Sequence, residues 1–216
     1  MGYLSNYKKE DFRQLSWQEY GKTLEILADK VSDYVLRSNL KVDAVVPILR
    51  AGAIPGTTLA YKLKVLRILP VQYKYFFSEG NMELRAILRL QTSELPEKPT
   101  LLVVEGNHCF GLTAQTAIND LKESFPGCRI LYAADHADHS YQKMSGVEEC
   151  FYGNLTNETR ALSEEECKEK GIFPLSFLFP WENIEEEFET VQGKQYEYAD
   201  KDSAIKGSEL KKTLKL

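Results

Sequence analysis

The sequence has few cysteines, no long hydrophobic run and no internal repeat. Its apolar runs are short, such as residues 101–104 and 177–179, whereas a membrane-spanning helix needs about 20 apolar residues. The first residues are polar and mixed in charge, unlike the basic and then apolar start of a secretion signal. The four cysteines are widely scattered, without the paired spacing of a zinc site. We therefore expect a cytoplasmic protein with free thiols and no membrane partner.

Basic residues are too few for a dedicated nucleic-acid-binding protein. The chain has 27 Lys and Arg against 32 Asp and Glu, a net charge of −5, whereas such proteins normally carry a basic surface. Its composition, 43% hydrophobic and 27% charged, is that of an ordinary globular protein. No linker-like composition interrupts the main part of the chain. We therefore expect one domain over residues 1–191 and a polar, Lys-rich tail over residues 192–216.

Helical and strand patterns alternate along the chain. Ser16 and Glu19 form a capping box at the start of a helical apolar stripe over residues 16–38. A valine-rich run over residues 42–49 is typical of a strand buried on both faces. This alternation predicts a three-layer α/β fold with a mainly parallel sheet of about five strands. Further patterns predict strands over residues 65–75, 101–104, 129–134, 149–152 and 173–179, and helices over residues 54–63, 111–123 and 163–170.

Two of the strand-to-helix turns have the composition of phosphate-binding loops. In sheets of this kind, ligands bind at the carboxyl ends of the strands. The first strand leads to Arg50 and Gly52, where a glycine allows close backbone approach and an arginine suits phosphate. The third strand leads to Gly111 and Thr113, which offer backbone amides and a hydroxyl. The first turn, taken alone, is equally compatible with an ordinary connection.

Taken in order, these turns resemble those of the type I phosphoribosyltransferases. Residues 46–52 are similar to the pyrophosphate loop of uracil-type members, and residues 104–113 to the motif that binds phosphoribosyl pyrophosphate (PRPP). Residues 177–182, Phe-Leu-Phe-Pro-Trp-Glu, resemble a Phe-Pro-Trp-Glu segment of xanthine- and hypoxanthine-type members, in which an aromatic ring stacks on the base. The resemblance covers about residues 12–190. It implies the fold of that family, including a small hood region.

The resemblance also implies an activity and a set of site residues. The enzyme would transfer phosphoribose from PRPP to a purine-like nitrogenous base and release pyrophosphate, with Mg²⁺ accompanying the diphosphate. The expected partners are these small molecules, and a homodimer is an open alternative to a monomer. The implied roles are catalysis by Glu105, phosphate binding by Arg50, Ala51, Gly52, Phe110, Gly111, Leu112 and Thr113, base binding by Phe177 and Trp181, and a flexible covering loop that carries Arg85 and Arg89.

The PRPP-binding motif is incomplete in this sequence. The family carries two adjacent acids and, further on, an Asp-Thr pair. Here Glu105 is retained, but Gly106 stands at the second acidic position, and Cys109 and Phe110 replace the Asp-Thr pair. Each lost charge-assisted hydrogen bond would remove ~1.5–3 kcal/mol of binding. Two functions therefore stay open, namely an active phosphoribosyltransferase and a catalytically degenerate relative that binds a nucleotide as a regulatory protein.

A second group of polar residues follows the fourth strand. Asp135, His136, Asp138 and His139 combine carboxylates with imidazoles, a set that suits zinc, iron or manganese. A metal site formed by Asp135, His136 and His139 is one interpretation. A polar surface turn, or a contribution to binding the base or leaving group, are the alternatives. His108, beside the incomplete motif, is either a replacement polar contact or a solvated loop residue.

Overall fold

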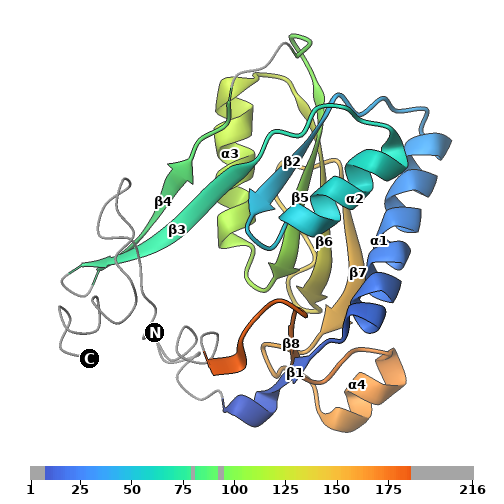
Figure 1. The fold of residues 1–216 in the computed structure, drawn as a ribbon, viewed down its shortest axis with the longest axis vertical. Coiled ribbons are helices and arrows are strands. Elements are labelled where there is room, and N and C mark those ends of the chain that lie inside the picture. Colours follow the sequence, from blue (N-terminus) through green and yellow to red (C-terminus); the bar gives the residue numbers. More distant parts are fainter. Residues whose placement is uncertain (1–7, 79–80, 92–94, 186–216) are drawn as a thin grey trace.

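The computed structural model describes residues 8–78, 81–91 and 95–185, so the predicted tail and its boundary at residue 191 lie outside the described residues. The described strands form a six-stranded sheet in the order β4-β3-β2-β5-β6-β7 (Figure 1). Neighbouring strands are parallel except β3 and β4, which are antiparallel. The strands are β2 (Ala44–Leu49), β3 (Val71–Ser78), β4 (Asn81–Leu88), β5 (Thr100–His108), β6 (Arg129–Asp138) and β7 (Glu149–Thr156).

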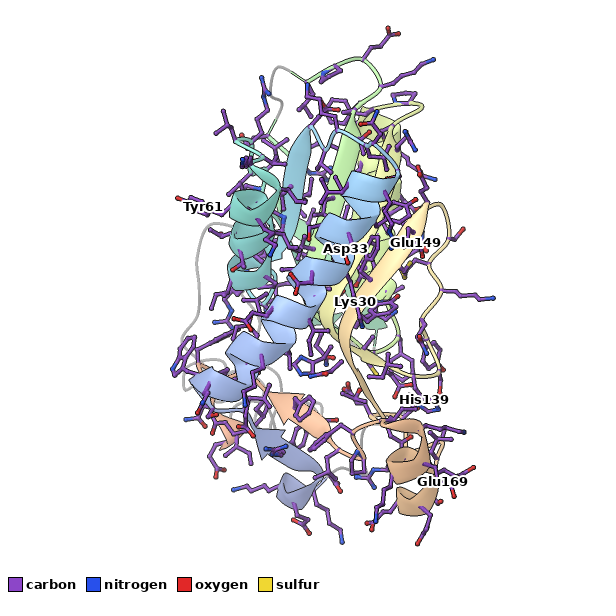
Figure 2. All side chains as sticks on the ribbon, turned by 90° about the vertical axis from the view of Figure 1, so that its right-hand side faces the viewer. Lys30, Asp33, Tyr61, His139, Glu149 and Glu169 are labelled. Atoms are coloured by element: carbon purple, nitrogen blue, oxygen red, sulfur yellow. The ribbon has the colours of Figure 1, made fainter. Side chains whose placement is uncertain are left out.

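Helices cover both faces of this sheet and complete the predicted three layers (Figures 1 and 2). α1 (Trp17–Arg37) and α2 (Ala53–Leu63) lie on one face, and α3 (Leu112–Ser124) lies on the other. Successive strand side chains point to opposite faces, so Val45 joins the buried cluster with α1 and α2, and Val46 joins the cluster with α3. None of the helices in the described part of the chain is long and apolar enough to cross a membrane.

The capping signals read from the sequence are present where they were predicted. The Ser16 hydroxyl accepts a hydrogen bond from the Glu19 amide, and the Glu19 carboxylate accepts one from the Ser16 amide. α4 (Glu164–Lys170) begins with the same arrangement between Ser163 and Glu166. Both helices begin as predicted, because this signal depends on residues only three apart in the chain.

A small second sheet lies at the carboxyl ends of the main strands (Figure 1). In it β1 (Phe12–Gln14), which follows a 3₁₀ turn over Lys9–Asp11, pairs in parallel with β8 (Ser176–Leu178). Leu15 and Phe179, next to these strands, are buried in a cluster with the start of α1. This unit is the hood that the family resemblance implies.

Several strand predictions differ from the structure. β3 begins at Val71 rather than at residue 65, because the Val65 amide is used to close the end of α2. β4 lies within the segment that we expected to be a flexible loop. β5 and β6 continue to His108 and Asp138, so polar residues that we placed in turns lie in strands. Pairing with neighbouring strands satisfies the backbone groups there, whatever the side chains are.

Candidate functional site

The turn after β2 lies against the carboxyl-terminal part of β5, at the sheet edge where we predicted the phosphate-binding turns. A Cβ atom added at Gly106 would lie 2.5 Å from the Cβ of Ala51, and one added at Gly52 would lie 2.3 Å from the carbonyl oxygen of Val104. The peptide bond between Leu49 and Arg50 is cis. Glycine is therefore needed at both positions because the two backbones pass too close for any side chain.

The turn between β5 and α3 has the backbone conformation of a helix start. Gly111 is the N-cap residue and has a left-handed conformation (φ 69°), which favours glycine. Thr113 follows in the first helical turn, where backbone amides are unpaired within the helix. Phe110 and Leu112 are 46% and 50% exposed, and the Phe110 ring packs against Tyr141. The helix start that we predicted at this turn is confirmed, and its ligand remains a prediction.

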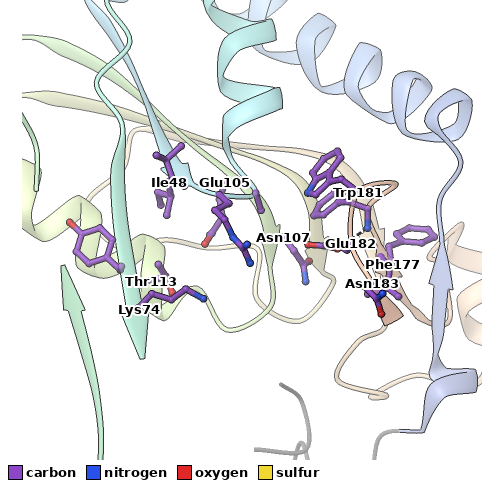
Figure 3. Close-up of a pocket in the computed structure, with 15 residues that line it drawn as sticks. Ile48, Lys74, Glu105, Asn107, Thr113, Phe177, Trp181, Glu182 and Asn183 are labelled. Atoms are coloured by element: carbon purple, nitrogen blue, oxygen red, sulfur yellow. Dashed lines mark hydrogen bonds between the residues drawn. The ribbon is translucent and has the colours of Figure 1, made fainter. Parts of the chain in front are cut away.

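A cavity of about 510 Å³ lies among these turns and the hood (Figure 3). Lys74 and Thr113 lie on one side of it, Phe177 and Trp181 lie on the other, and Asn107 lies between them. Arg50 also lines the cavity, so two cations of the described residues, Arg50 and Lys74, border it together with Glu105 and Glu182. The cavity thus has a polar end at the sheet and an aromatic end at the hood.

The aromatic end is built from rings that support one another. The rings of Trp181 and Phe179 stack with centroids 4.9 Å apart, and Tyr20 packs edge-on against both. Phe177 stacks on Phe173 with centroids 4.0 Å apart. An offset stack of this kind offers a flat apolar wall to a planar ligand.

The cavity brings together part of the predicted site. Tyr73 and Asn107 line it without having been assigned a role from the sequence. The alternation of side chains along β3 would have indicated Tyr73, and the extension of β5 to His108 would have indicated Asn107. The cavity lining includes Arg50, Ala51, Glu105, Thr113, Phe177 and Trp181, but not Gly52, Phe110, Gly111, Leu112, Arg85 or Arg89.

The segment with Arg85 and Arg89, which we expected to be a flexible loop, pairs with β3 as an antiparallel strand. Arg85 lies in β4 opposite Lys74 of β3, and Arg89 follows the end of β4. The sequence did carry a signal for β4 that our prediction did not use, because apolar Met82, Leu84 and Ala86 alternate with other side chains along this strand. The hairpin places Lys74, rather than either arginine, at the cavity.

Glu105 belongs to a chain of hydrogen bonds that leads away from the cavity. The Tyr132 hydroxyl lies 2.7 Å from Oε2 of Glu105 and 2.9 Å from Nδ1 of His108. Nε2 of His108 lies 2.6 Å from the carbonyl oxygen of Tyr141. Burial raises the pKa of Glu105 to about 7, although the hydrogen bond from Tyr132 acts in the opposite direction. Glu105 can therefore hold a proton at neutral pH.

His108 is neither solvated nor in a loop. It is the last residue of β5 and is 1% exposed, because Tyr132 of β6 and Tyr152 of β7 pack against its ring. Burial lowers the pKa of His108. This burial could not be predicted from the sequence, because both tyrosines come from distant segments.

The orientation of Asn107 is fixed by a half-buried acid, Glu158. Its side-chain amide donates to the carboxylate of Glu158, at 3.1 Å. Burial raises the pKa of Glu158, and the neighbouring carboxylate of Asp138 raises it further. This contact fixes the orientation of the one amide side chain that lies in the middle of the cavity in Figure 3.

The structure does not bring the predicted metal ligands together. Within residues 8–78, 81–91 and 95–185, no three His, Cys, Asp or Glu side chains converge on one metal position. Asp135 and His136 are buried within β6, and His136 packs between Phe177 and Phe179. His139 lies beyond the end of β6, near α4 (Figure 2). The surface-turn interpretation is also wrong, because residues 135–138 are inside the sheet.

Asp138 has a structural role instead. Its Oδ1 accepts hydrogen bonds from the Ser140 amide and the Thr159 hydroxyl, and its Oδ2 accepts one from the Thr159 amide. These bonds tie the connections that follow β6 and β7 to the sheet. A carboxylate bonded in this way has little capacity left for a metal ion.

A second cavity of about 470 Å³ lies beside the sheet, between α1 and the edge strand β7. Lys30, Asp33 and Glu149 border it (Figure 2). The Lys30 ammonium donates to the backbone carbonyl of Tyr152 at 2.7 Å. The cavity has mixed charges and no glycine turn or helix start of the described chain, so the candidate site is the first cavity.

Solved structures with the same architecture are phosphoribosyltransferases and a relative of unassigned function. A purine phosphoribosyltransferase from Pyrococcus horikoshii matches with a TM-score of 0.57 at 18% identity, over 80% of this chain and 95% of that one. A hypothetical protein from Neisseria gonorrhoeae with bound ppGpp matches with a TM-score of 0.58 at 18% identity, over 84% and 96%. The xanthine-guanine-hypoxanthine phosphoribosyltransferase of Helicobacter pylori matches with a TM-score of 0.56 at 14% identity, over 83% and 99%.

No family model matches the chain, and no curated protein matches it in sequence. The similarity is therefore one of fold. The chain has the type I phosphoribosyltransferase fold, as its turn motifs predicted.

Proposed function

We propose that the cavity binds a phosphorylated ribose compound and that the protein transfers phosphoribose from PRPP to a purine-like base, releasing pyrophosphate. The observation that carries this proposal is the order of groups along one cavity. Side chains suited to binding phosphate, namely Arg50, Lys74 and Thr113, lie at one end of the cavity. A wall of stacked aromatic rings that includes Trp181 lies at the other end. Glu105 lies at the polar end, where a ribose would bridge the two.

In this reaction the protein acts mainly by position and charge. The sugar carbon passes through a cation-like state, and a carboxylate at Glu105 stabilises that charge. Arg50 and Lys74 neutralise the departing pyrophosphate, and the amides at the start of α3 hold the 5′-phosphate. Mg²⁺ would accompany the diphosphate of the substrate and would neutralise part of its charge. The ring wall of Phe177 and Trp181 orients the base.

The second candidate function is a nucleotide-binding regulatory protein. The contact between Ala51 and Gly106 favours it, because there is no room at position 106 for the second acid that the family carries. One carboxylate, Glu105, would then stabilise the ribose cation alone. One structural neighbour is described with bound ppGpp, so this guanine nucleotide is a suitable probe for the regulatory function.

Calorimetry followed by a base panel separates the two functions. PRPP with Mg²⁺ and ppGpp are titrated separately, and pyrophosphate release is then measured with adenine, guanine, hypoxanthine, xanthine and uracil. A transferase binds PRPP and releases pyrophosphate with at least one base. Binding of ppGpp without release of pyrophosphate supports the regulatory function. If neither compound binds, both proposals are wrong.

A further inference from the structure

The hydrogen-bond chain from Glu105 to Tyr141 restricts where its protons can lie. The Tyr141 backbone carbonyl can only accept a hydrogen bond, so Nε2 of His108, 2.6 Å away, must carry a proton. The Tyr132 hydroxyl lies within hydrogen-bond distance of both Glu105 and His108 but has one proton to donate. One of these two neighbours must therefore donate to the Tyr132 oxygen.

Two arrangements satisfy every link of this chain. In the neutral arrangement, a protonated Glu105 donates to the Tyr132 oxygen, and Tyr132 donates to Nδ1 of a neutral His108. In the charged arrangement, Nδ1 of a protonated His108 donates to Tyr132, and Tyr132 donates to a Glu105 carboxylate. Both contain the same number of protons. If the chain loses one proton, Tyr132 would have to donate in two directions, and one link fails.

We propose that Tyr132 and His108 are positioning residues that convert Glu105 to its carboxylate when a phosphorylated ribose occupies the cavity. This inference rests on the proposed function of the site. The Oε2–H bond of Glu105 breaks as a new O–H bond forms on Tyr132, and the original hydroxyl proton of Tyr132 passes to Nδ1 of His108. No proton leaves the protein.

The relay creates a positive charge on His108, next to the turn where we expect a phosphate to bind. The His108 ring lies directly against Gly111, since a Cβ atom added there would lie 2.4 Å from Cε1 of His108. Gly111 is the N-cap of α3, whose first-turn amides form the predicted phosphate site. A ligand with ribose hydroxyls at Glu105 and a phosphate at this turn therefore favours the charged arrangement at both of its ends. A ligand without phosphate favours it at one end only.

The groups around the relay fit a neutral resting state. Tyr132 and Tyr152 face His108 from β6 and β7, and the Asp138 carboxylate raises the pKa of His108 without overcoming the effect of burial, which lowers it. Burial raises the pKa of Glu105 to about 7, even though its cavity neighbours Arg50 and Lys74 are cations, which favour a carboxylate. Without a ligand, burial thus favours the uncharged form at both ends.

Nitrogen NMR of the histidine rings tests the relay directly. The chain has three histidines, so ¹⁵N-histidine labelling gives a simple spectrum, and the His136→Gln and His139→Gln variants assign it. At pH 7 we expect His108 to be neutral and protonated on Nε2 in the free protein. Saturation with ribose 5-phosphate, monitored by calorimetry, should convert His108 to the imidazolium.

Two tyrosine variants provide the matched comparison. Tyr132→Phe keeps the buried ring and removes the relaying hydroxyl. We expect His108 to stay neutral in this variant and ribose 5-phosphate to bind about tenfold more weakly, the scale of one charge-assisted hydrogen bond. Tyr152→Phe also alters a ring that packs on His108, but its hydroxyl donates to the Gln142 carbonyl, outside the relay. This variant should charge His108 as the wild type does.

The outcomes are distinguishable. Binding of ribose 5-phosphate with a neutral His108 overturns the relay and leaves the proposed function standing. A charged His108 in the free protein, a proton on Nδ1 alone, or charging of His108 in Tyr132→Phe overturns it as well. If ribose 5-phosphate, PRPP and ppGpp all fail to bind, the proposed function fails and the relay fails with it.

Discussion

Two pairs of an acid and a histidine lie on adjacent strands of the sheet, and they differ in what surrounds them. Glu105 and His108 on β5 are linked through Tyr132, and Glu105 borders the cavity. Asp135 and His136 on β6 contact each other directly, with Nδ1 and Oδ2 2.8 Å apart, under the rings of the hood. The first pair has access to a ligand, whereas the second is sealed.

This difference separates a functional pair from a structural one. A ligand can change the protonation of Glu105 because it can touch the carboxyl group. Nε2 of His136 has no hydrogen-bond partner within the described structure, and the side chain is 1% exposed. The Asp135–His136 pair can therefore affect stability, because a buried polar group that loses its partner costs free energy.

The largest expected effect is a loss of stability when the buried Asp135–His136 pair is broken. His136→Leu leaves the Asp135 carboxyl buried with the Thr23 hydroxyl, 3.1 Å away, as its described partner. We expect the free energy of unfolding to fall by about 3–5 kcal/mol, the cost of breaking a buried pair by removing one member. Urea denaturation measures this change. Asp135→Asn, which keeps a hydrogen-bond acceptor for Thr23, should cost less, and a loss below about 1 kcal/mol in His136→Leu would contradict the assignment.

The Glu105–His108 pair should make the free energy of unfolding depend on pH. The pKa of Glu105 is about 7 in the folded protein and 4.5 in its ordinary state, so the folded protein keeps a proton that the unfolded chain loses. Stability should therefore fall as the pH rises from about 4.5 to 7, by up to about 3 kcal/mol. Urea denaturation at pH 5 and pH 8 should show this fall in the wild type and not in Glu105→Gln.

Glu148 provides a control for that experiment. Its hydrogen bonds from Arg129 lower its pKa, so it is ionised in both the folded and the unfolded state above pH 5. Glu148→Gln should keep the pH dependence of the wild type. A flat wild-type profile between pH 5 and pH 8 would show that Glu105 is already ionised when the cavity is empty.

A smaller effect is expected on turnover. Glu105→Gln keeps the shape of the side chain and removes the charge that stabilises the ribose cation, so we expect a loss of about tenfold or more, equivalent to ~1.4 kcal/mol. Pyrophosphate release with the most active base measures it, and PRPP affinity replaces it if no base is accepted. The matched control is Asp135→Asn, which should retain activity within about threefold once its folded fraction is known. Equal losses in both variants would remove the distinction between the pairs.

The smallest effect is expected from added metal. The hydrogen bonds to Asp138, the burial of His136 and the position of His139 beyond the strand end leave these side chains without a common focus. Equimolar Zn²⁺ or Mn²⁺ should therefore shift Tm by less than about 1 °C. A rise of several degrees that disappears in His139→Gln would restore the metal interpretation.

The local features of this fold could be predicted because their causes are local. The capping box of Ser16 and Glu19 involves residues three apart, and the valine-rich β2 is apolar because helices cover both of its faces. The glycine turn at Gly52 was also predictable, since a close approach of two backbones excludes other residues. These features were enough for the α/β architecture and for one edge of the site.

The roles of the polar residues were decided by tertiary structure. The sequence left Asp135, His136 and His139 open as a metal site, a surface turn or a contribution to ligand binding, and it offered no reason to connect Glu105 with His108. Tyr132, 27 positions after Glu105, connects them because parallel strands β5 and β6 lie side by side.

What the sequence determined by itself was the alternation of elements, the helix starts and the glycine turns, because each depends on neighbours along the chain. Only the tertiary structure decided which acid faces a ligand and which is sealed. Protonation and access depend on burial and on partners from other strands, as Glu105 beside the cavity and Asp135 beneath the hood show. The sequence by itself does not specify the burial of a residue or its partners from other strands.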